Sequence, residues 1–192
     1  MSVVAQPHTE SARQALRITV TGQVQGVGFR PFVHRIATRL GLSGAVRNDA
    51  GQVEITVCGS DAALQSFVAV LIGEAPPSAR PRIARVEPAT PLEDAAFRIE
   101  ASTSQAPRDA HLPPDRTPCA ECLSELFDLA NRRHRHPFIN CTQCGPRYTI
   151  IRDLPYDRAS TSMAGFAMCA ACRAEYEEPA NRRFHAEPLA CP

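Results

Sequence analysis

Seven of the eight cysteines of this 192-residue chain lie in its last 74 residues, in a pattern that repeats. The repeated cysteines are 50 positions apart: Cys119 and Cys169, Cys122 and Cys172, Cys141 and Cys191. The tetrapeptide Ala-Asn-Arg-Arg recurs with the same offset, at 130–133 and 180–183. Because two unrelated features share one period, we interpret this region as a duplicated module. The counterpart of Cys144 would fall two positions beyond the last residue, so we expect the chain to be a fragment of a longer protein.

The spacing within each unit is typical of a metal site. Each Cys-x2-Cys knuckle can direct two thiolates at one ion, and two knuckles complete a tetrahedral Zn²⁺ site without an open position, which is a structural site. The predicted ligands are Cys119, Cys122, Cys141 and Cys144 in the first unit and Cys169, Cys172 and Cys191 in the second. An iron–sulfur cluster or a redox dithiol is less favoured, because neither a third knuckle nor a thioredoxin-like context accompanies the pairs. His185 could act as a substitute fourth ligand, although we favour a position at the surface or behind the ligands.

Composition excludes several classes of function. All 21 basic residues are arginine, so Schiff-base chemistry and a Walker-type phosphate loop, which need lysine, are excluded. The net charge of +1 shows no footprint of a nucleic-acid or membrane binder. For the basic stretch 132–136 we therefore favour a solvated face or a contact between modules over nucleic-acid binding. With no signal peptide and no long apolar run, clustered cysteines indicate the cytoplasm.

The first half of the chain alternates strands and helices. Alternating or β-branched runs predict strands over 16–20, 43–47, 52–57, 83–86 and 97–100. Apolar spacing of three to four predicts helices over 31–40, with proline at the first position, and over 61–72, capped by Ser60 or Asp61.

These elements indicate an α+β fold. The order β-α-β-β-α-β is that of the ferredoxin-like sandwich, in which helices cover one face of an antiparallel sheet. We expect a disordered N-terminus over 1–14, this domain over 15–101, a linker over 102–114, and a tandem zinc-ribbon-like module over 115–192. Cys58 lies in a predicted strand as a small buried hydrophobe.

A glycine-rich turn joins the first strand to the first helix. Glycines 22, 26 and 28 allow the backbone to approach a ligand closely, and the helix N-terminus favours an anion there. Arg30 could bind two phosphate oxygens at once. A glycine-rich turn alone could equally be an ordinary tight connection.

The segments GQVQGVGFR (22–30) and GAVRNDAGQVEI (44–55) resemble the acylphosphatase signature. The resemblance implies that Arg30 binds phosphate together with the loop of Gln25, Gly26, Val27, Gly28 and Phe29, and that Asn48 positions the attacking water. Since an acyl phosphate already has a good leaving group, charge stabilisation and alignment suffice, without a strong general acid. Taken alone, Asn48 could be an ordinary turn residue.

The second half resembles a longer family, the carbamoyltransferase maturation factors of nickel–iron hydrogenases. The matching segments include CAEC (119–122), PFINCTQCGP (137–146), YDR (156–158) and RRFHAEPLACP (182–192). The resemblance implies hydrolysis of carbamoyl phosphate or another acyl phosphate here. It also implies use of ATP in domains that this chain lacks, and transfer of the carbamoyl group to a cysteine of a partner maturation protein, toward metal cyanide ligands.

Two features lie outside these expected roles. Glu187 stands where we expect glutamine, with no expected role, and His34 is assigned none. A different class of function remains open: a non-catalytic anion-binding fold with zinc-dependent protein docking. A nucleic-acid-binding zinc protein is a third class, which predicts steeply salt-dependent affinity.

Overall fold

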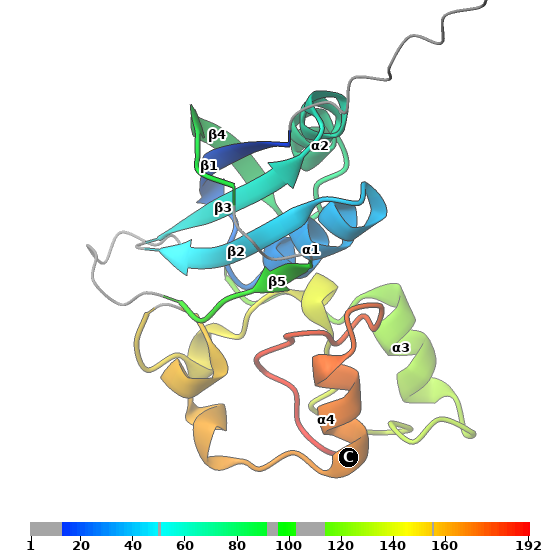
Figure 1. The fold of residues 1–192 in the computed structure, drawn as a ribbon. Helices are drawn as coiled ribbons and strands as arrows, with labels where there is room; N and C mark the ends of the chain where they lie inside the picture. The colour runs from blue at the N-terminus through cyan, green and yellow to red at the C-terminus, as the bar shows by residue number, and fades with distance from the viewer. Residues whose placement is uncertain (1–12, 50, 92–95, 103–113, 155) are drawn as a thin grey trace, which may run out of the picture.

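A computed structural model describes residues 13–49, 51–91, 96–102, 114–154 and 156–192. The predicted N-terminal segment 1–14 and linker 102–114 lie almost entirely outside the described residues, as does Ala50 of the turn at 48–51. A sheet with two helices forms one half of the molecule, and short helices and loops form the other (Figure 1). The halves contact each other where Gly26 and Gly28 face Pro146 and Thr142, and where the Ser78 hydroxyl donates a hydrogen bond to the carbonyl of Gln143.

Each element is defined by its first and last residue. The strands are β1 (Gln14–Gln23), β2 (Ser43–Asp49), β3 (Gln52–Gly59), β4 (Arg80–Pro88) and β5 (Phe97–Ile99). The helices are α1 (Phe29–Arg39), α2 (Asp61–Gly73), α3 (Ala120–Phe127) and α4 (Ala170–Glu177). Four 3-10 turns are η1 (Thr142–Cys144), η2 (Tyr148–Ile150), η3 (Arg158–Ser160) and η4 (Ser162–Gly165).

The sheet has the strand order β4-β1-β3-β2-β5, and α1 and α2 cover one of its faces (Figure 1). Ile18 pairs with Ile55 across the central strands β1 and β3, and both side chains are fully buried against the helices. The ferredoxin-like α+β fold predicted from the sequence is confirmed. One strand differs from the expected antiparallel sheet: β5 runs parallel to β2, with Phe97 opposite Gly44. The chain crosses from β4 at one edge to the opposite edge, so β5 enters beside β2 in the same direction.

Helix boundaries match the predicted caps closely. Ser60 caps α2 by accepting a hydrogen bond from the amide of Ala63 at 3.4 Å. Helix α1 begins at Phe29, two residues before the predicted start. Pro31 is therefore still in the first turn, where its missing N–H is not needed for the helix.

The two cysteine modules share one local structure. Cys119 and Cys169 are the N-caps of α3 and α4, and Cys122 and Cys172 follow inside each first turn with fully buried side chains. The modules have the knuckles expected of zinc-ribbon-like units. Among their described residues, however, the only β pairing is the isolated bridge between Ile151 and Thr161.

Two further sequence expectations concern burial. Cys58, in β3, is fully buried, as predicted. In the part of the chain that the structure describes, we find no helix that has the length and apolar character needed to cross a membrane.

Candidate functional site

The turn between β1 and α1 forms a concave loop. Gly26 and Gly28 have φ values of 66° and 73°, in the left-handed region that favours glycine. Gln25 beside them is buried, and neither its Nε2 nor its Oε1 has a partner among the described residues. The loop therefore presents backbone and amide polar groups at the N-terminus of α1, an arrangement that suits an anion.

The first cysteine module packs directly on this loop. A Cβ atom added to Gly26 would lie 2.7 Å from Cβ of Pro146, and one added to Gly28 would lie 2.9 Å from Cβ of Thr142. Thr142 lies inside the second knuckle of the module, between Cys141 and Cys144, and Pro146 follows it two positions later. The two glycines are thus required by interdomain packing as well as by backbone conformation.

A comparison of two alanine variants separates these two requirements. Gly41, after α1, has a φ of 64° but no atom within 4 Å of an added Cβ. We expect Gly41→Ala to cost about 1 kcal/mol from backbone strain, and Gly28→Ala to cost about 1–3 kcal/mol more from overpacking. Urea unfolding measures both free energies. Equal costs would contradict the contact between module and loop.

Arg30 and Asn48 come together beside the loop. Arg30 is in the first turn of α1, and Asn48 lies near the end of β2 with 1% exposure. With the Asn48 amide oriented so that its oxygen faces donors, this oxygen accepts hydrogen bonds from Nε and Nη2 of Arg30, each at 3.3 Å. The two residues predicted from the resemblance are thus neighbours, although 18 positions separate them in the sequence.

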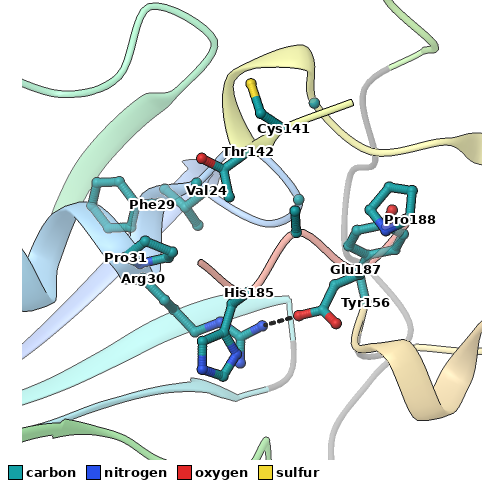
Figure 2. Close-up of a pocket in the computed structure, with 14 residues that line it drawn as sticks. Val24, Phe29, Arg30, Pro31, Cys141, Thr142, Tyr156, His185, Glu187 and Pro188 are labelled. Carbon is teal, nitrogen blue, oxygen red and sulfur yellow. Dashed lines mark ion pairs between the residues drawn. The ribbon is translucent and has the colours of Figure 1, made fainter. Parts of the chain in front are cut away.

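Arg30 also contacts two carboxylates from the cysteine modules. Its Nη2 lies 2.5 Å from Oδ1 of Asp157 and 3.6 Å from Oε1 of Glu187. Figure 2 shows the guanidinium extending toward Glu187 beside the ring of His185. The expectation that Glu187 has no role near the site is wrong. The fold of the chain brings this side chain to Arg30, and no local sequence pattern indicates that contact.

The surroundings shift two ionisable groups. Burial raises the pKa of Glu187 to about 7, against the opposing effect of the Arg30 cation. Burial, followed by the charge of Arg30, lowers the pKa of His185 to about 4. His185 is therefore neutral at pH 7, and Arg30 is the cation of this site.

The space around these groups is small. A cavity of about 20 Å³ lies between the loop and the modules, lined by Arg30, Thr142, Tyr156, His185 and Glu187 among others (Figure 2). This volume holds about one water molecule. An anion the size of phosphate can reach the Arg30 guanidinium only when the carboxylates of Asp157 and Glu187 withdraw. Asp157, Tyr156 and His185 were not predicted as neighbours of the site, although Tyr156-Asp157-Arg158 is one of the segments that carry the family resemblance.

Seven cysteines form two separate clusters, and their thiols form no disulfides. In the first, the Sγ–Sγ distances are 3.6 Å for Cys119–Cys141, 3.8 Å for Cys141–Cys144 and 3.6 Å for Cys122–Cys144. A tetrahedral ion with Zn–S bonds of about 2.3 Å requires sulfur separations near 3.8 Å, so this donor set fits Zn²⁺. The second cluster brings Cys169, Cys172 and Cys191 within 4.8 Å of one another.

Two other sequence interpretations are resolved by the structure. His185 is not in the second cluster, since its ring lies 5.1 Å from that of Tyr176 and lines the cavity beside Arg30. Arg132 and Arg133, from the basic stretch, contact Glu175 of the other module. The inter-module alternative thus describes these two arginines.

Comparisons with known proteins agree with this architecture. The Acylphosphatase family model matches residues 16–99, and the HypF finger model matches residues 119–151 and 168–192. An acylphosphatase from Caldivirga maquilingensis is 44% identical over 81 residues, covering 41% of this chain and 84% of that protein. The sheet topology, the glycine-rich loop and the family matches together define an acylphosphatase domain followed by finger modules. The chain therefore carries a domain of an enzyme class.

Longer relatives cover both halves. Carbamoyltransferase HypF of Rhodobacter capsulatus is 52% identical over 181 residues, which are 93% of this chain and 24% of that protein. The crystal structure of a full-length HypF in the phosphate- and nucleotide-bound form superposes with a TM-score of 0.84, at 44% identity over 93% of this chain and 24% of that one. The chain belongs to the HypF family and spans about a quarter of the length of these relatives.

Proposed function

We propose that this chain hydrolyses carbamoyl phosphate, or a related acyl phosphate, at the site formed by Arg30, Asn48 and the loop of residues 25–29. The observation that carries the proposal is the direct contact of the Arg30 guanidinium with the Asn48 amide beside the left-handed glycines. A cation and aligned backbone donors recognise the phosphoryl group. The acylphosphatase match and the phosphate-bound HypF relative support the same substrate class.

The residues divide the reaction between them. On substrate binding, the phosphate dianion replaces Asp157 and Glu187 as the partner of Arg30. The Nδ2 group of Asn48 then orients a water in line with the phosphorus. The water oxygen attacks phosphorus, the bond to the carbamate oxygen breaks, and a phosphate oxygen takes the proton. Stabilisation of charge by Arg30 and the loop provides most of the catalysis, because carbamate is already a good leaving group.

The remaining roles follow from family membership. We propose that both cysteine clusters hold Zn²⁺, which supplies structural cross-links. Cys119, Cys122, Cys141 and Cys144 would hold one ion, and Cys169, Cys172 and Cys191 would contribute to the other. In the longer relatives, we propose, carbamate is activated with ATP beyond this region and transferred to a cysteine of a hydrogenase maturation partner in the cytoplasm.

Loss of the Asn48 side chain tests the catalytic proposal. We expect Asn48→Ala to lower kcat for phosphate release from carbamoyl phosphate at least about 100-fold, with a smaller change in KM, because water alignment is lost while Arg30 still binds phosphate. The exposed Gln65→Ala variant on α2 is the matched amide control and should behave like wild type. Equal inactivity of wild type and Asn48→Ala would refute the enzymatic function of this chain.

One observation favours a second candidate function. Arg30 is already paired with two carboxylates, and the cavity has room for about one water. A permanently closed site would bind no anion, and this region would then act as a non-catalytic, zinc-dependent protein-docking module. In that case inorganic phosphate would fail to release the ion pairs, and calorimetry would detect no binding that depends on Arg30.

A further inference from the structure

Arginines of each cysteine module donate hydrogen bonds to cysteine sulfurs of the other module. Arg132, from the first module, donates from Nη2 to Sγ of Cys172 at 3.1 Å and to Sγ of Cys169 at 3.6 Å. Arg133 donates to the Cys172 sulfur at 3.6 Å. The sulfurs of the second cluster are therefore contacted by guanidinium groups that lie 37 to 40 residues earlier in the chain.

The second module makes the reciprocal contacts. Arg182 donates from Nη2 to Sγ of Cys122 at 3.1 Å and from Nη1 to Sγ of Cys119 at 3.5 Å. The distance to the second cysteine of each knuckle is thus the same in both directions. A geometry built twice, from equivalent positions of a duplicated sequence, is a property of the module.

Further contacts hold the arginines in place. Glu175 binds Arg132 at 3.3 Å and Arg133 at 2.5 Å, and Glu125 binds Arg182 at 3.0 Å and also contacts Arg183. The two glutamates occupy equivalent positions in α4 and α3. Glu175 lies about one turn after Cys172, and Glu125 lies about one turn after Cys122.

The asparagine of each repeated Ala-Asn-Arg-Arg segment fixes the local turn. Oδ1 of Asn131 accepts from the amide of Arg133, and Oδ1 of Asn181 accepts from the amide of Arg183, both at 2.9 Å. The repetition of this tetrapeptide with the same period as the cysteines is thereby explained. It carries the groups that reach the other cluster.

The arginine contacts offset the negative charge of the metal-binding thiolates. Four thiolates around one divalent ion carry a net charge of −2, and the first cluster is mostly buried. A guanidinium is always charged and donates strong hydrogen bonds to anions, so it can neutralise this excess. Groups that hydrogen-bond the ligands of a metal commonly change its affinity 10- to 100-fold.

We propose that each metal centre is completed by the arginines of the opposite repeat. Arg182 retains the ion held by Cys119, Cys122, Cys141 and Cys144, and Arg132 retains the ion held by the second cluster. Because each contact joins the two modules, binding of metal at one cluster stabilises the other, and this coupling is reciprocal. These arginines are positioning residues for the thiolates and are not themselves ligands.

Site-resolved thiol labelling tests the proposal. The zinc-loaded chain is incubated with a chelator and iodoacetamide, and alkylation of each cysteine is followed by peptide mass spectrometry. We expect Arg182→Gln to speed labelling of Cys119 and Cys122 about 10- to 100-fold, and to affect Cys169 and Cys172 less. Arg132→Gln should show the opposite selectivity. Arg182→Lys, which keeps the charge, should restore part of the protection.

Arg173→Gln is the matched control, because Arg173 lies in α4 on an exposed surface and forms an ion pair with Glu177 at 3.7 Å. It should label like wild type. Far-UV circular dichroism and the metal-to-protein ratio, before chelator is added, separate a misfolded variant from a folded one with a weaker site. Three results would each overturn the proposal. They are faster labelling confined to the module that carries the substitution, uniform labelling of all seven cysteines, and no change in either variant.

Discussion

Replacement of Arg30 by alanine is expected to lower phosphate release from carbamoyl phosphate at least about 100-fold. Arg30 is the cation of the cavity, since His185 beside it is held neutral by burial. Without the guanidinium, the negative charge that builds on the phosphoryl oxygens is balanced by loop amides alone. Arg30→Lys should retain only part of the activity, because an ammonium cannot bind two oxygens with the geometry of a guanidinium. Release of inorganic phosphate measures both variants.

A structural control is needed for this variant, because alanine also leaves two carboxylates without their partner. Glu187 is almost fully buried and would lose its nearest cation. The double variant Arg30→Ala/Glu187→Gln removes this buried charge and should recover thermal stability without recovering activity. Arg39→Ala, on the same helix but in an exposed ion pair with Glu74, should keep wild-type activity. If Arg30→Ala hydrolyses carbamoyl phosphate within twofold of wild type, Arg30 is not the phosphate-binding residue.

Removal of metal, or Cys141→Ser, is expected to unfold the first cysteine module. The buried apolar groups of this module are few and consist largely of the cysteines themselves, with Ile139. Structural Zn²⁺ provides on the order of 10 kcal/mol to such small units, which is comparable to the whole stability of a small domain. The sheet and its helices have their own apolar cluster and should remain folded.

Loss of the module should also change the loop of residues 25–29. Thr142, inside the second knuckle, and Pro146, just after it, pack against Gly28 and Gly26, so unfolding of the module removes one wall of the cavity. We expect loss of zinc, faster proteolysis after 114, and weaker binding of inorganic phosphate by calorimetry. Cys58→Ala, in the sheet, should leave the metal content unchanged. Wild-type metal content and protease resistance in Cys141→Ser would contradict a structural role for that thiolate.

The secondary structure and the ligand sets could be predicted from local patterns. Strand and helix periodicity in the first half depends on burial of one face, which operates within a few residues. The observed strands extend the predicted ones by two or three residues at several ends, β5 ends one residue earlier than predicted, and α1 begins two residues early at Phe29. The cysteine spacings predicted which sulfurs gather, because a knuckle is itself a local structure.

The environment of Arg30 could not be predicted in this way. Its partner Asp157 lies 127 positions away, and Glu187 lies further still. Neither the acylphosphatase resemblance nor any periodicity concerns contacts between the two halves of the chain. The contacts of Arg132 and Arg182 with the cysteines of the opposite module could not be predicted either, although the sequence shows that Ala-Asn-Arg-Arg repeats with the period of the cysteines.

By itself the sequence determined the α+β fold, the duplicated modules, the seven gathered thiols and the pairing of Arg30 with Asn48. Only the tertiary structure decided that the modules pack on the loop of residues 25–29, that Asp157 and Glu187 pair with Arg30, and that each repeat provides arginines to the other. The physical reason is the sequence distance over which each interaction acts. Backbone periodicity and knuckle geometry act over a few residues, whereas the partner of a buried charge is selected by packing between segments far apart in the chain.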